Sequence, residues 1–206
     1  MCKNEVALLW LLRGIEDFFM GFQIDNPFSR YRPFFYSMGV EMVGKSYLLA
    51  KRASAYETLD DKQARTAANK IAKEAGHSLK RLVDELKGST RRRELDAVLG
   101  ATFDGFSGVR LLDALGAAYM EARYPIPNPI EEKFPVEGVP GAHWKPLCGS
   151  GLGKFCLAFT REIVYALKMD FGIVLPRSSL DYYLSGTAGP RFLNALFESR
   201  ADAFLA

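Results

Sequence analysis

Apolar residues recur every three or four positions along most of the chain, which is the spacing of one face of an α-helix. Residues 34–54 show this spacing most clearly, because two adjacent apolar lines run along the whole stretch. A helix with so wide an apolar face is expected to be deeply buried. Glu41 and Lys45 share the remaining face, four residues apart and in the order that favours a salt bridge.

The same periodicity predicts further helices, separated by proline, glycine and cap residues. Asp60 and Asp61 are candidate N-caps for the helix that follows them. Gly76 either lies within that helix or ends it, in which case His77 and Ser78 begin another. The expected helical ranges are 4–22, 34–54, 61–88 with that optional break, 91–99, 108–124, 152–171 and a last helix that starts at Pro190.

No stretch alternates apolar and polar residues for long enough to predict a strand, so the sequence predicts an all-α fold. Residues 125–153 interrupt the helices, because six of the ten prolines and five glycines fall there. This irregular segment is longer than most loops, and its apolar residues, among them Trp144 and Leu147, predict that it packs on the helices. We expect residues 1–206 to form one domain, in which two extra helices within 152–206 pack on the core.

The net charge is only +3, but the charges are unevenly distributed. Residues 62–93 contain ten Lys or Arg and three acidic residues, a surplus of seven positive charges, so the rest of the chain has a net charge of −4. Clustered cations attract polyanions such as nucleic acid and release counterions on binding. A solvated helix face explains the same charges without a ligand. The candidate nucleic-acid-binding residues are Lys80, Arg81, Lys87, Arg91, Arg92 and Arg93.

Candidate chemistry outside this basic stretch is sparse. The sequence CGSGLGKF at 148–155 is similar to a phosphate-binding loop, but it lacks the first Gly and the final Ser or Thr of that motif. Its glycines precede a predicted helix, and the free backbone N–H groups at the N-terminus of a helix can still bind an anion. Cys148 and His143 are neighbours in sequence, which does not make them a nucleophile and its base. We expect no cofactor and no metal, because no spacing of His, Cys and carboxylates matches a metal site.

Cysteine usage favours a reducing compartment. Cys2, Cys148 and Cys156 are scattered and form neither a disulfide framework nor a CxxC motif. No uncharged stretch reaches the length of a membrane span, and no signal-peptide cleavage site is evident. We therefore expect a cytoplasmic protein with no membrane partner.

His77 lies in an otherwise helical stretch, KEAGHSLKRLVDEL at 73–86. One interpretation is structural, either as an N-cap residue or as a buried imidazole that bonds a backbone carbonyl. The other is general acid–base catalysis, for which the ordinary pKa of histidine is well placed. Sequence spacing alone identifies no catalytic partner.

Three segments, in this order, resemble helical domains of the HEPN type. The segment VEMVGKSYLLAK at 40–51 resembles the second-helix pattern of that family. The segment GHSLKRLVDEL at 76–86 resembles its GHxLxxL segment, and AYMEARYPIP at 118–127 resembles the RYP that closes a later helix. Their order and spacing fit the family across residues 5–127, and nothing comparable covers 128–206.

The resemblance implies an up-and-down helical bundle that is often dimeric, in a family many of whose members bind or process RNA in stress, defence or toxin–antitoxin settings. The ribonuclease signature of the family, an Arg followed by four to six residues and then His, is absent, since Arg65 is too far before His77 and Arg123 too far before His143. On the family pattern, His77 belongs to the segment that packs helices.

The leading hypothesis is therefore a non-catalytic, HEPN-like module that binds RNA or nucleotides and forms a homodimer. A first alternative is a protein-interaction or structural module without ligand chemistry, whose contacts come from 125–153 and the last helix. A second alternative is a divergent ribonuclease, whose candidate catalytic residues are His77, Arg123, Glu41 and Tyr124.

Overall fold

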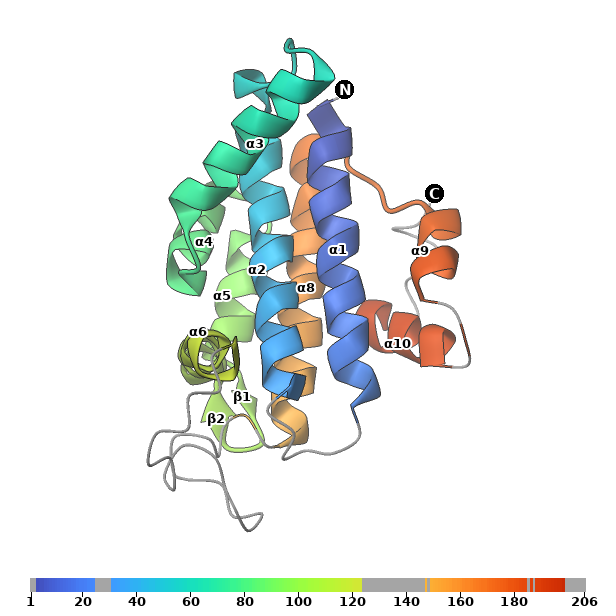
Figure 1. Ribbon diagram of the computed structural model, residues 1–206. Coiled ribbons are helices and arrows are strands. Elements are labelled where there is room, and N and C mark those ends of the chain that lie inside the picture. The colour runs from blue at the N-terminus through green and yellow to red at the C-terminus, as the bar shows by residue number, and fades with distance from the viewer. Residues whose placement is uncertain are drawn as a thin grey trace.

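The computed structural model describes residues 3–24, 31–123, 147, 149–184, 186 and 188–198, and it shows a bundle of helices (Figure 1). The predicted all-α class is confirmed. Among the described elements, α1 (Lys3–Gln23), α2 (Tyr31–Lys51) and α8 (Ser150–Phe171) are the longest, and α2 packs against both of the others. The remaining helices are α3 (Asp61–Ala75), α4 (Leu79–Glu85), α5 (Arg92–Gly100), α6 (Gly108–Arg123), α9 (Arg177–Tyr183) and α10 (Ala188–Phe197), with single 3-10 turns at Ala53–Ala55 and Leu86–Gly88.

The boundary between α3 and α4 follows the predicted caps. Asp60 begins α3, because its carboxylate accepts a hydrogen bond from the backbone N–H of Gln63 at 2.8 Å. Gly76 ends α3 with a φ of +64°, a conformation that glycine adopts without strain. Ser78 then caps α4 by accepting a hydrogen bond from the N–H of Arg81 at 3.2 Å. The helix therefore does not run through Gly76, which places His77 in the short junction between α3 and α4.

A small β-hairpin between α5 and α6 was not predicted from the sequence. Its strands, β1 (Thr102–Phe103) and β2 (Phe106–Ser107), pair in antiparallel register. Asp104 and Gly105 form the two-residue turn, with φ values of +49° and +87°. An Asp-Gly pair between apolar residues is a strong hairpin signal, but strands of two residues are too short to show an alternating pattern.

α2 and α10 each begin before the proline that was expected to precede or start the helix. α2 begins at Tyr31, so Pro33 lies within its first turn, where the N–H that proline lacks has no helical partner to lose. α10 begins at Ala188, and Pro190 likewise lies in its first turn. The structure also adds the short helix α9 between α8 and α10.

Most of the predicted irregular segment, 125–153, lies outside the described residues. Residues 124–146 and 148 are not described, and this includes Trp144. Leu147 is described and is buried, as predicted. The last four residues of the segment, 150–153, are helical and form the first turn of α8.

One apolar core connects the described helices. It contains side chains from every helix between α1 and α10 that the structure describes, and α2 lies at its centre because it packs against α1, α3, α4, α6 and α8. Phe192 attaches α10 to α1 through ring contacts with Phe19 and Phe22, each with centroids 5.4 Å apart. Core residues with no exposed area include Leu11, Leu49, Leu111, Phe155 and Phe192. The C-terminal helices thus pack on the same core as the N-terminal ones.

The closest approach of α1 and α2 requires glycine. A Cβ atom at Gly39 would lie 2.5 Å from the ring of Phe18. A Cβ atom at Gly14 would lie 2.7 Å from Cγ2 of Val43 and 3.0 Å from the carbonyl oxygen of Gly39. Neither helix has room for a methyl group here without separating from the other.

We therefore expect Gly39→Ala to lower the free energy of unfolding by about 1–3 kcal/mol, because the new methyl group overpacks the contact with Phe18. Gly116→Ala in α6 is the matched control, since no atom lies within 4 Å of the Cβ position there. That substitution should instead stabilise the helix by about 0.5–1 kcal/mol through its better helix propensity. Urea denaturation of both variants measures the difference, and equal midpoints would show that the close approach does not constrain the fold.

Candidate nucleic-acid interface

The second half of α2 is covered on nearly all sides. Between Gly39 and Ala50, every residue except Met42 is buried. The face that Glu41 and Lys45 share is therefore not a solvent face, and their side chains are only 4% and 6% exposed. The sequence shows that they share a face, but only the packing of the neighbouring helices shows that the face is covered.

Glu41 and Lys45 form a buried ion pair. Nζ of Lys45 lies 2.6 Å from Oε1 of Glu41, one helical turn away on α2. The same ammonium lies 5.8 Å from the centroid of the Trp10 ring on α1, which is within range of a cation–π interaction. A charge removed from water needs such partners, because its desolvation costs several kcal/mol, on the order of the whole stability of a domain.

His77 completes this polar cluster from the α3–α4 junction. Its Nδ1 lies 3.0 Å from both carboxylate oxygens of Glu41. Because an ionised carboxylate only accepts hydrogen bonds, Nδ1 carries the hydrogen and Nε2 of the neutral ring is the acceptor. The imidazole ring stacks on the ring of Tyr119 of α6 with centroids 4.4 Å apart. The side chain of His77 is still 49% exposed. His77 thus joins α2, α6 and the α3–α4 junction while its side chain stays partly exposed.

The structure brings together two of the four candidate catalytic residues. His77 and Glu41 are in direct contact. Arg123 is the last residue of α6, but its side chain and the whole of Tyr124 lie outside the described residues. The described geometry is therefore that of a His–Glu pair with a lysine behind it.

The six predicted nucleic-acid-binding residues differ in how many partners they have. Four of them contact neighbouring groups. Arg91 donates a hydrogen bond from Nε to Glu162 at 3.0 Å and lies over the ring of Tyr165. Arg92 forms an ion pair with Asp96, and Lys87 forms one with Asp84. Arg81 donates to the backbone carbonyl of Glu74. For Lys80 and Arg93, the described part of the chain shows no ion pair. The positive charge of α4 and α5 is thus partly neutralised by adjacent acids.

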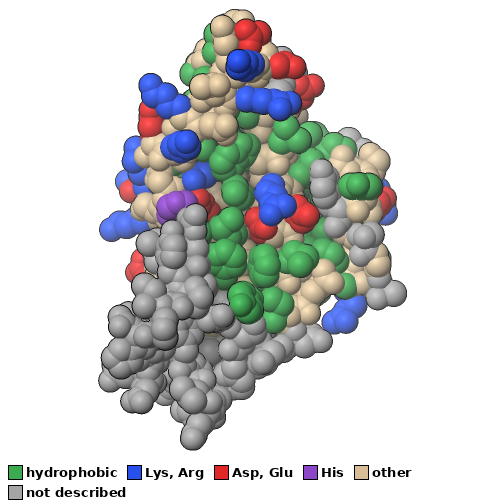
Figure 2. All heavy atoms as spheres, viewed as in Figure 1, with side chains coloured by type: hydrophobic (Ala, Val, Ile, Leu, Met, Phe, Trp, Pro, Cys, Tyr) green, Lys and Arg blue, Asp and Glu red, His purple; other side chains and the backbone are tan. Residues whose placement is uncertain are grey.

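A more continuous basic surface lies on α3. Lys62, Arg65, Lys70 and Lys73 are all exposed, and their spacing distributes them over the solvent-facing half of the helix rather than along a single line. We call these four residues the α3 basic stripe. None of its three lysines forms an ion pair with a described residue, and Figure 2 shows Lys and Arg side chains over α3 and α4. The stripe lies within the basic stretch found in the sequence, and the spacing of its cations could have identified it there.

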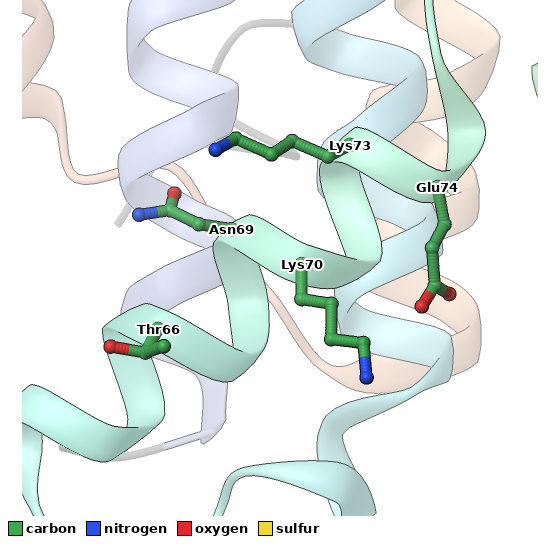
Figure 3. Close-up of a pocket in the computed structure, with 5 residues that line it drawn as sticks. All are labelled: Thr66, Asn69, Lys70, Lys73 and Glu74. Carbon is green, nitrogen blue, oxygen red and sulfur yellow. The ribbon is translucent and has the colours of Figure 1, made fainter.

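The α3 basic stripe borders a shallow concavity of about 580 Å³ lined by Thr66, Asn69, Lys70, Lys73 and Glu74. Figure 3 shows that Thr66, Asn69 and Lys73 project to one side of α3, whereas Lys70 and Glu74 project to the other. Glu74, at the edge, lies 3.7 Å from Arg52 of the preceding segment, so its charge is shared with a cation outside the stripe. The surface therefore offers ammonium groups together with neutral hydrogen-bonding side chains.

The glycine-rich start of α8 does not offer a free anion site. The carboxylate of Asp104 in the hairpin accepts hydrogen bonds from the hydroxyl of Ser150 at 2.7 Å and from the N–H of Gly151 at 2.6 Å. These bonds, together with the charge of Lys154, hold the pKa of Asp104 below its usual range. The N-terminus of α8 is thus already occupied by a carboxylate of the same chain.

Comparisons of this chain with protein-family models, with curated proteins and with solved structures found no match. Within the ranges that the structure describes, no group of His, Cys, Asp and Glu residues could hold a metal ion. No helix in those ranges is both long enough and apolar enough to span a bilayer.

The buried ion pair makes a prediction about stability. We expect Lys45→Met to lower the free energy of unfolding by about 3–5 kcal/mol, because it leaves the Glu41 carboxylate buried without its counter-charge. The double variant Glu41→Gln/Lys45→Met removes both charges, and the amide oxygen of the new glutamine can still accept from His77, so most of the loss should be recovered. Chemical denaturation measures the free energy of unfolding of the single and the double variant, and their difference shows how much of the loss comes from the unpaired charge. A double variant no more stable than Lys45→Met would mean that packing, rather than charge, accounts for the loss.

Proposed function

We propose that this chain is a non-catalytic RNA-binding module, HEPN-like as its sequence resemblance implies, that contacts the RNA phosphate backbone along α3. The observation that carries the proposal is the α3 basic stripe, whose lysines have no acidic partner among the described residues. The resemblance alone supplies the expected setting in stress, defence or toxin–antitoxin systems. The homodimer that it implies stays a prediction.

The arrangement of the stripe suits phosphates. From Lys62 to Lys73 the stripe extends over about 16 Å along the helix axis. Lysine is a flexible point charge that binds phosphate without fixing its orientation. Such contacts give affinity through counterion release and carry no base sequence information. Binding should therefore be tolerant of sequence and strongly dependent on salt. Lys80 and Arg93, for which the described residues show no ion pair, are exposed on α4 and α5, the helices that follow.

The test is RNA binding by Lys70→Gln/Lys73→Gln as a function of salt concentration. We expect the wild type to bind a single-stranded RNA with an affinity that falls linearly with salt on logarithmic axes. Removing two phosphate contacts should reduce that slope by about 1.4 and weaken binding equally for different sequences. Fluorescence anisotropy with a labelled oligonucleotide measures both quantities.

Arg110→Gln/Arg191→Gln is the matched control, because it removes the same charge from exposed positions on α6 and α10. It should leave the slope unchanged. The proposal fails if the wild type does not bind RNA, or if the two double variants change the slope equally.

One observation favours a second function, RNA cleavage. His77 donates from Nδ1 to a buried carboxylate while about half of its side chain stays exposed (49%), and such a hydrogen bond holds a general base in one tautomer. In such a reaction Nε2 would take the proton of a ribose 2′-hydroxyl. The same contacts also suit a purely structural histidine, as the sequence resemblance implies.

A pair of substitutions separates the two roles of His77. His77→Asn can keep the hydrogen bond to Glu41, since the amide nitrogen of Asn replaces Nδ1, but it has no group that accepts a proton near neutral pH. If His77 is structural, His77→Asn should be close to the wild type in stability, His77→Ala should lose about 1 kcal/mol, and neither should change RNA binding. If it is catalytic, wild-type cleavage of a labelled RNA should disappear in both variants, and an oligonucleotide without 2′-hydroxyls should resist the wild type. Cleavage that persists in both variants would exclude the catalytic role.

A further inference from the structure

A second hollow lies between α1 and α3. It has a volume of about 270 Å³ and is lined by Val6, Leu9, Trp10, Arg65, Ala68 and Asn69. Asn69 also lines the larger concavity beside the α3 basic stripe, so the two spaces adjoin at this residue. Arg65 belongs both to the stripe and to the wall of this hollow. A chain that follows the lysines would therefore pass the mouth of the hollow.

The hollow exposes apolar and aromatic surface that has no cover among the described residues. Leu9 is 54% exposed, and Trp10 is only partly buried. The Lys45 ammonium lies 5.8 Å from the indole ring, and this cation–π contact ties the ring to the buried ion pair of α2. The indole is thus held in position before any ligand arrives, which limits the entropy that binding must cost.

We propose that this hollow binds an unstacked base of single-stranded RNA, whose phosphates lie on the α3 basic stripe. The inference rests on the proposed function and adds the kind of RNA that the site takes. Indole and guanidinium planes both stack on nucleobases, and such stacking tolerates any base. The amide of Asn69 can both donate and accept, so it suits a base edge or a 2′-hydroxyl at the junction of the two spaces.

A duplex cannot use the hollow in this way. Its bases are stacked and paired, so placing one beside Trp10 requires unpairing that costs a few kcal/mol. Duplex RNA still presents phosphates to the lysines. We therefore expect the α1 side of the hollow to give a preference for single-stranded RNA. The lysines of α3 should give the salt dependence of binding.

The fluorescence of Trp10 tests the inference directly. The chain has two tryptophans, so Trp144→Phe leaves Trp10 as the only reporter. We expect a single-stranded oligonucleotide to change the Trp10 emission over the same concentration range as its binding measured by anisotropy. A duplex of equal length should bind through its phosphates and leave the emission nearly unchanged.

Leu9→Ser and Met20→Ser provide matched variants without removing the reporter. Both residues are exposed and apolar on α1, but only Leu9 lines the hollow. Leu9→Ser should weaken single-strand binding several-fold, and Trp10→Leu by about 10-fold, with duplex affinity and the salt slope unchanged in both. Met20→Ser should bind like the wild type.

The outcomes separate this inference from the proposed function. In one outcome, RNA binds with the expected salt slope while Trp10 emission does not respond and Leu9→Ser binds like Met20→Ser. That result would contradict base binding in the hollow and support phosphate binding on the α3 basic stripe. If the wild type binds neither form of RNA, both are wrong. A Trp10 response to duplex as large as that to single strands also overturns the base site.

Discussion

The buried carboxylate of Glu41 is the group around which α1, α2, α6 and the α3–α4 junction are arranged. A carboxylate in an apolar core is tolerated only where cations and hydrogen-bond donors meet it with good geometry. Lys45 and His77 meet that requirement from α2 and from the α3–α4 junction. The junction must therefore lie where the imidazole reaches α2, and α3 and α4 leave it in directions set by their own caps. The apolar core stabilises the bundle, while this cluster restricts which arrangement of helices is acceptable.

The same cluster contacts Trp10, on which the further inference rests, and contains His77, the residue considered for cleavage. On one side Lys45 faces the indole of Trp10, and on the other His77 stacks on Tyr119. α3 lies across α2 through a face made mostly of alanine, so its backbone approaches the core closely, and none of its long cations is among its buried residues. A flexible basic segment could hold the same charges, but it could not hold them beside a fixed aromatic ring. A helix of fixed position that carries these charges beside a fixed ring is what we expect of a binding surface rather than of a merely solvated helix face.

Local signals in the sequence predicted local structure well. Asp60 and Ser78 act through hydrogen bonds to residues three positions away, and Gly76 acts through its own φ, so each effect is contained in a few adjacent residues. The burial of Glu41 and Lys45 depends on helices that are distant in sequence, and no local pattern contains it. The partial neutralisation of Arg91 by Glu162 is of the same kind, since 71 residues separate the two. Helical periodicity could have identified the α3 basic stripe, but only the structure shows which of its cations form no ion pair with a described residue.

The start of α8 shows why the candidate interface depends on side-chain cations rather than on backbone groups. A glycine-rich helix N-terminus is a common phosphate site because its N–H groups converge on an anion. Here the hairpin places Asp104 on those groups, and a Cβ atom at Gly151 would lie 2.8 Å from the backbone of Phe103. The glycines therefore serve the close packing of the hairpin on α8, and an incoming phosphate would have to displace a charged group already bonded there. If the chain binds a polyanion as proposed, the flexible lysines of α3 are the groups that would contact it, which favours contacts with the backbone of the ligand over a site shaped for one nucleotide.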